Sequence, residues 1–124
     1  MERMKMNGER KNVVADKSMD FAVRIVNLSR YLAERCRETV LSRQTLRSGT
    51  SIGANIREAN SAQSKQDFIS KCAISLKECD ETGYWLELLL RTQYLTQEEF
   101  ESLEHDRQEL FALLTAIIKT ARSS

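Results

Sequence analysis

No proline occurs in the 124 residues of this chain, and glycine occurs only four times. Proline and glycine are the residues that most often end helices and form turns. Glu, Leu, Arg, Ala and Ser dominate the composition instead, and most of these residues favour helix. The chain offers few places at which a long helix can stop, and we expect an all-α fold.

The length and the hydrophobic content of 41% fit one domain with a single core. Apolar residues recur at spacings of three and four, which is the pattern of helices that bury one face. The expected helices lie at about 17–37, 40–62, 65–92 and 97–121. Together they predict an antiparallel up-down four-helix bundle over residues 16–124.

Capping signals mark the expected helix starts. Asp16 is a plausible N-cap of the first helix, and residues 1–15 lack apolar periodicity, which predicts a mobile N-terminal tail. Capping boxes open the third and fourth helices. The pairs that form them are Ser64 with Asp67 and Thr96 with Glu99. The connection between these two helices is short, so we expect them to be antiparallel neighbours.

The expected second helix contains two glycines four residues apart, Gly49 and Gly53, beside the apolar residues Ile52 and Ile56. Each glycine inside a helix costs about 1 kcal/mol relative to alanine. Close approach of a neighbouring backbone would compensate for that cost, so we interpret these four residues as a helix-packing site. A kink or a short break at residues 48–50 is the alternative.

Basic side chains gather on the second helix, opposite its apolar face, and continue toward the third helix. They are Arg43, Arg47, Arg57, Lys65 and Lys71. Residues 1–77 carry a net charge of +7 and residues 78–124 a net charge of −6. The basic residues are candidates for contacts to RNA or DNA phosphates, or for ion pairs with the acidic fourth helix of a neighbouring copy.

The third helix carries more apolar surface than one antiparallel bundle covers, because Trp85, Leu88 and Leu89 widen its apolar stripe. A helix that is apolar on more than one side contacts more than one neighbour. This excess predicts a homo-oligomer.

No residues occur in a catalytic or metal-binding pattern. His105 is the single histidine and lies in an acidic stretch, and the cysteines Cys36, Cys72 and Cys79 form no C-x-x-C motif. The stretch SGTSIGAN lacks the residue order of a phosphate-binding loop. We therefore expect a protein that is not an enzyme and that holds no cofactor and no metal.

The chain also lacks signals for membranes and for secretion. Its longest apolar stretches are far shorter than the roughly 20 residues of a membrane span. The N-terminal sequence MERMKMNGERKNVV is charged and has no apolar core of a signal peptide. Together with three unpaired cysteines, this predicts a cytoplasmic protein with no membrane partner.

An ordered set of motifs runs through LRSGTSIGANIREANSAQSKQDFISKCAISLKECDETGYWLELL and the residues that follow it. The motifs are Ser51-Ile52, Ala54-Asn55-Ile56, Glu58, Ser64-Lys65, Asp67-Phe68, Glu78, Glu81, Thr82 and Tyr94-Leu95-Thr96. From about Phe21 onward, the chain resembles a bacterial four-helix-bundle family encoded in intervening sequences of 23S ribosomal RNA genes. Many relatives carry proline where this chain has Gly53.

The resemblance implies a small bundle that assembles into a ring, usually a homopentamer. The family also includes the accessory variability determinant of diversity-generating retroelements, a basic pentamer that binds a reverse transcriptase and nucleic acid. The resemblance therefore implies a bacterial oligomeric scaffold. Its further partners would be RNA or DNA, or a protein such as a reverse transcriptase.

Overall fold

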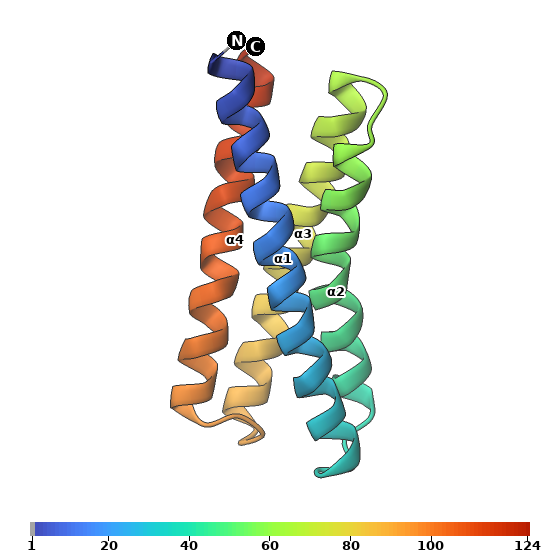
Figure 1. Ribbon diagram of the computed structural model, residues 1–124. Helices are drawn as coiled ribbons and strands as arrows, with labels where there is room; N and C mark the ends of the chain where they lie inside the picture. Colours follow the sequence, from blue (N-terminus) through green and yellow to red (C-terminus); the bar gives the residue numbers. More distant parts are fainter. Residues whose placement is uncertain (1) are drawn as a thin grey trace.

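A computed structural model describes the backbone of residues 2–124 and the side chains from residue 13 onward, and these residues form four long helices (Figure 1). The helices are α1 (Glu2–Glu34), α2 (Val40–Asn60), α3 (Lys65–Arg91) and α4 (Gln97–Ser123). The described residues contain no strand, which confirms the all-α prediction. The last three helices begin at residues 40, 65 and 97, as the sequence predicts.

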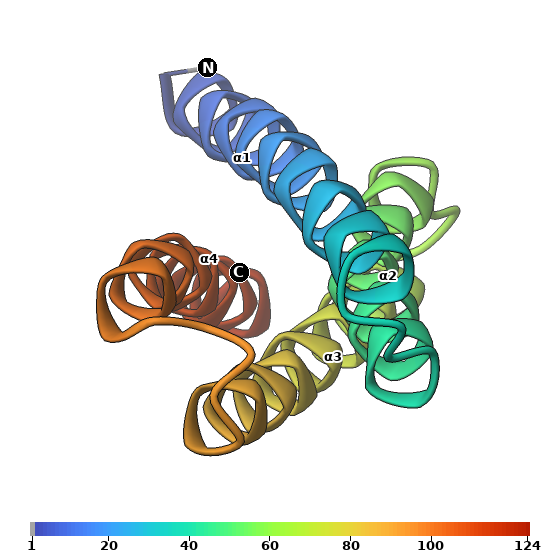
Figure 2. The ribbon, with the colours of Figure 1, turned by 90° about the horizontal axis from the view of Figure 1, so that it is seen from below.

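The four helices form an up-down bundle in which each helix runs antiparallel to the next (Figure 1). α2 packs against α1 and α3, and α4 packs against α3 and α1. Among the described residues, α2 does not contact α4, and α1 does not contact α3. These two pairs therefore lie at diagonal corners of the bundle (Figure 2).

The first helix begins earlier than predicted, so the prediction of a tail over residues 1–15 is wrong for its last residues. α1 already begins at Glu2, and Asp16 lies inside it rather than at its N-cap. Val14 is only 2% exposed and belongs to the core. It lies four residues before Ser18 and therefore on the same buried face of α1 as Ser18 and Phe21. The side chains of residues 1–12 lie outside the described part of the chain, so the mobility predicted for these residues stays a prediction.

Local hydrogen bonds fix the ends of the helices. The Ser64 hydroxyl accepts from the backbone N–H of Asp67 at 3.0 Å. Thr96 and Glu99 form the predicted reciprocal capping box, with bonds of 3.1 and 2.9 Å. α1 ends at Glu34 rather than near residue 37, and Arg37 has a positive φ of 55°. The chain turns there.

The core lies along the bundle axis and is apolar on all four helices. Its fully buried large side chains include Phe21, Ile25 and Leu32 of α1, Ile52 of α2, Leu86 and Leu89 of α3, and Leu110 and Leu114 of α4. Between α1, α2 and α3 the core also contains small hydroxyl residues. Ser29 bonds to Ser42 at 2.8 Å, and Thr82 donates to Ser48 at 3.0 Å. Small side chains let these three helices approach closely.

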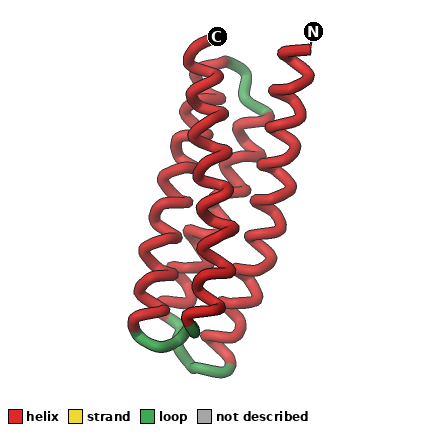
Figure 3. The backbone as a smooth tube through the Cα atoms, turned by 90° about the vertical axis from the view of Figure 1, so that its left-hand side faces the viewer, coloured by secondary structure: helices red, strands yellow, loops and turns green. Residues whose placement is uncertain are grey.

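α1 and α4 separate toward one end of the bundle. The N-terminus of α1 and the C-terminus of α4 overlap in Figure 1 but lie apart when the molecule is turned (Figures 2 and 3). The loop between α2 and α3 lies at the same end (Figure 3). A pocket opens there, at the end of the bundle that holds both chain termini.

Candidate interaction surfaces

The three arginines of the α2 basic face, Arg43, Arg47 and Arg57, are all exposed. Arg47 donates to Glu78 of α3 at 3.1 Å and also to Glu81 of α3. Neither Arg43 nor Arg57 forms an ion pair with any side chain that the structure describes. Only these two arginines are therefore available to a partner without breaking an existing pair.

Arg47 belongs to a small network on the outer side of α3. The Trp85 indole donates to the same Glu81 carboxylate at 3.0 Å, and this bond, together with Arg47, holds the pKa of Glu81 below its ordinary value. Hydrogen bonding to Glu81 in turn raises the pKa of Arg47. The Tyr84 ring meets the Trp85 ring edge to face at 5.0 Å and is 63% exposed. The network connects Arg47 to Trp85 through the Glu81 carboxylate, and Tyr84 packs against Trp85.

The two predicted lysines also have partners inside the chain. Lys71 of α3 pairs with Glu58 of α2 at 3.2 Å. Lys65 donates to the backbone oxygen of Ser124 at 2.5 Å. The structure thus does not bring the five predicted basic residues into one open patch, because three of them are held by neighbouring helices.

The predicted helix-packing residues of α2 act inside the chain. Ile52 and Ile56 are buried in the core. A Cβ at Gly49 would come 2.8 Å from two carbons of Ile25, and a Cβ at Gly53 would come 3.3 Å from the Ser18 hydroxyl. Both glycines therefore face α1, and α2 continues through residues 48–50 without a break.

A groove between α1 and α2 carries the clearest unpartnered apolar surface. Met19 and Val23 on α1 are 50% and 53% exposed. Met19 lines the groove, which has a volume of about 530 Å³, together with small residues such as Ala22, Gly53 and Ala54 and the charged Arg57 and Glu58, and Val23 lies just outside this lining. This surface was not predicted from the sequence. The signal was present, because Met19, Val23 and Val26 form a second apolar stripe on the first helix at a 4-3 spacing.

The excess apolar surface predicted on the third helix is smaller in the structure. Leu89 is fully buried, and Trp85 and Leu88 are half-buried. Ile74 and Tyr84 remain exposed on the outer side of α3. The α1/α2 groove is therefore a better candidate for an apolar contact than α3.

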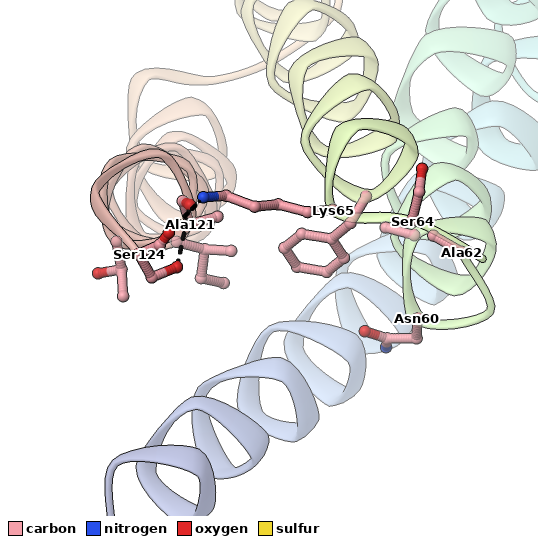
Figure 4. A pocket seen from close by; sticks show the side chains of 10 residues that line it. Asn60, Ala62, Ser64, Lys65, Ala121 and Ser124 are labelled. Atoms are coloured by element: carbon pink, nitrogen blue, oxygen red, sulfur yellow. Dashed lines mark hydrogen bonds between the residues drawn. The ribbon is translucent and has the colours of Figure 1, made fainter.

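Figure 4 shows the pocket at the open end of the bundle, which has a volume of about 390 Å³. Lys65 reaches across it from the start of α3 toward the last residues of α4, and Asn60 and Ser64 lie on the side of the α2–α3 loop (Figure 4). The Lys65 ammonium is already bonded to Ser124. The pocket contains no cluster of acids, bases or nucleophiles among its lining residues.

The side chains of residues 13–124 include no group of three His, Cys, Asp or Glu residues that could hold a metal ion. The three cysteines are free thiols, and Cys72 and Cys79 are buried. Burial raises the pKa of the Cys79 thiol to about 11. Cys79 therefore stays protonated near neutral pH and is a poor nucleophile. Over residues 2–124, no helix has the length and apolarity to cross a bilayer.

Comparison with known proteins decides the family. Residues 10–116 match the sequence profile of the 23S rRNA-intervening sequence proteins. The chain belongs to this family. No curated protein matches it significantly in sequence. A solved structure from Bacteroides thetaiotaomicron, a protein with unknown function from the S23 ribosomal protein family, is 60% identical and superposes with a TM-score of 0.88, covering 89% of this chain and 98% of that chain. Membership of the 23S rRNA-intervening sequence proteins confirms the resemblance seen in the sequence.

Proposed function

We propose that this 23S rRNA-intervening sequence protein is a non-enzymatic cytoplasmic scaffold that works as a ring-shaped homo-oligomer, with five subunits as the expected number. One observation carries the proposal: Met19 is exposed in the α1/α2 groove beside small residues, and Val23, one helical turn along α1, is exposed next to it. Contiguous apolar surface of this kind is rare on monomers and typical of interfaces. The expected absence of a catalytic site agrees with a scaffold role.

The test is the mass of the full chain in solution. Light scattering after size exclusion is expected to give a particle near five times the 14.3 kDa of one chain. The double variant Met19→Asp, Val23→Asp places two charges in the groove and is expected to give monomers, because a buried unpaired charge costs several kcal/mol. The control is Val13→Asp, an exposed apolar residue of α1 outside the groove. A monomeric wild-type protein at micromolar concentration contradicts the proposal.

Nucleic-acid binding is a second candidate function, and the unpaired Arg43 and Arg57 favour it. Each phosphate contact adds about 0.7 to 0.9 to the slope of log affinity against log salt. The double variant Arg43→Gln, Arg57→Gln should therefore flatten the slope for RNA by about 1.5. An unchanged slope, or no salt-dependent binding at all, excludes this function for the α2 arginines.

A role as an accessory subunit for another protein, such as a reverse transcriptase, is the third candidate. The exposed Tyr84, which packs against Trp85, favours it, because Tyr and Trp are enriched in the residues that dominate binding energy at protein interfaces. Tyr84→Ala should then release a protein that co-purifies with the wild-type chain. Loss of a co-purifying RNA by salt, with no protein, would favour nucleic-acid binding instead.

A further inference from the structure

We propose that α4 of a second copy lies in the α1/α2 groove, with its Glu101 between Arg30 and Arg43 of the first copy. The inference rests on the proposed oligomer and names the two surfaces that meet. The groove and α4 are complementary in charge and shape, and they lie on different faces of the bundle. Each of these three properties supports their pairing.

The position of α4 suits contact with another copy. α2 and α4 lie at diagonal corners of the bundle, so the groove beside α2 and the outer edge of α4 face different directions (Figure 2). When two different surfaces meet, the assembly still has one free groove and one free α4 edge, so a further copy can be added in the same way. Such a head-to-tail contact builds a ring when the rotation between copies closes.

The outer edge of α4 has the shape of a narrow ridge. Its exposed residues recur at a 4-3 spacing along the helix and therefore form one stripe. They are Glu101, His105, Gln108, Ala112 and Thr115, and the stripe continues toward the C-terminus with Lys119 and Arg122. Between Glu101 and Lys119 these side chains are short or of medium length. Such a ridge suits a groove floored by Ala22, Gly53 and Ala54.

Two positively charged side chains near one end of the groove favour an acidic partner. Arg30 of α1 and Arg43 of α2 are both exposed, and neither forms an ion pair among the described side chains. Their neighbours Ser29 and Ser42 are hydrogen-bonded to each other at 2.8 Å. The two arginines therefore lie at nearly the same height on neighbouring helices, outside the lining of the groove and nearer the loop between α1 and α2, where two like charges favour an anion between them.

Contacts between α1 and α4 define the position of Glu101 along the bundle axis, which is called its height here. Arg24 of α1 bonds to Ser102 and Asp106 of α4, and the two helices are antiparallel. At 1.5 Å of rise per residue, this places Glu101 within about 5 Å of the height of Arg43. If the rotation axis of the ring is parallel to the bundle axis, each residue has the same height in every copy. Glu101 of one copy then meets the arginine pair of the next.

A basic residue on another helix should not take part. Arg57 is unsuitable as a control, because it lines the groove itself. Lys77 of α3 is exposed and lies neither in the groove nor on α4. Reversal of the charge of Lys77 is therefore the control for reversal of the charge of Arg43.

Charge reversal and rescue in the full chain test the pairing. At low salt, Arg43→Glu and Glu101→Arg should each raise the subunit dissociation constant at least about tenfold, because each variant places like charges together at the interface. The triple variant Arg30→Glu, Arg43→Glu, Glu101→Arg reverses all three charges, restores the opposite pairs at every interface and should return to within about threefold of wild type. Lys77→Glu should change the constant less than about threefold. Circular dichroism verifies that each variant is helical.

A cross-linking measurement gives a result that does not depend on affinity. Met19 and Gln108 lie at similar heights on the two proposed surfaces. In a chain with Cys36→Ser, the double variant Met19→Cys, Gln108→Cys should form a ladder of linked chains with a short bismaleimide, because each maleimide adds one thiol. The single Met19→Cys variant should give no linked dimer.

The outcomes separate the inference from the proposed function. A monomeric wild-type chain overturns both. An oligomer that neither charge reversal weakens, or that the triple variant fails to restore, overturns the α4 contact and leaves the scaffold in place. Efficient linking of the single Met19→Cys variant also overturns the inference, because it means that two grooves face each other.

Discussion

The three helix-interior glycines with described surroundings each lie where another group fills the space of a side chain. Gly49 faces Ile25 and Gly53 faces Ser18, both on α1. Gly83 of α3 lies under the guanidinium of Arg107, and a Cβ there would come 2.7 Å from Cζ of that arginine. Glycine costs a helix about 1 kcal/mol relative to alanine, and at these positions close packing compensates.

Gly49→Ala should lower the free energy of unfolding. The added Cβ would lie 2.8 Å from Cγ1 and Cγ2 of Ile25, a residue with no exposed surface and no space to move. Overpacking of this kind costs about 1–3 kcal/mol, which outweighs the helix propensity gained. Urea denaturation measures the effect.

Gly53→Ala is the matched control, because its Cβ would lie 3.3 Å or more from Ser18. Its free energy of unfolding should stay within about 0.5 kcal/mol of wild type or rise. Equal destabilisation by the two variants would mean that α1 and α2 are packed differently from the structure described above.

Between elements, a mostly buried ion pair within α4 lies at the contact of α3 with α4. Arg107 bonds to both oxygens of Glu104 at 2.6 Å and donates to the backbone oxygen of Cys79 on α3 at 3.2 Å. Burial raises the pKa of Glu104, but the hydrogen bonds and the charge of Arg107 outweigh it, and the net shift is downward. The charged form of Glu104 therefore stabilises the fold.

Glu104→Gln should destabilise the protein at neutral pH and not in acid. The pKa of Glu104 is lower in the folded chain than the value of about 4.3 in the unfolded chain, so its contribution is complete above about pH 5 and is lost as pH falls through the folded pKa. The expected loss is about 1–2 kcal/mol at pH 7, and it falls toward zero as the pH falls through the folded pKa of Glu104.

Urea denaturation across this pH range measures the effect of Glu104→Gln. Glu98→Gln, on the same helix but exposed, is the control and should show little change at any pH. A loss of stability that is equal at both ends of the range would contradict a role for the charge of Glu104.

For the whole molecule, the arrangement of surfaces links stability to assembly. A chain that assembles only when folded is stabilised by its own concentration. Raising the concentration a hundredfold should therefore raise the melting temperature by about 5–10 °C. Scanning calorimetry measures this shift, and the double variant Met19→Asp, Val23→Asp should lose it. A wild-type melting temperature that is independent of concentration argues against an assembly coupled to folding.

The sequence by itself determined the features that depend on near neighbours in the chain. The lack of proline and the 3-4 apolar spacing predicted four helices, and the caps at Ser64 and Thr96 predicted two of their starts. The start of α1 was missed because one buried residue, Val14, followed by polar residues gives too weak a periodic signal. The family was also readable from the order of local motifs.

Only the tertiary structure decided which side chains meet across helices. It paired Arg47 with Glu78 and Glu81 and left Arg43 unpaired, although both arginines lie on one face of α2. It also joined Met19 to the small residues Gly53 and Ala54 of α2 in one groove. The physical reason is that periodicity encodes which face of a helix is apolar, whereas the rotation, height and separation of packed helices depend on how all the side chains between them fit.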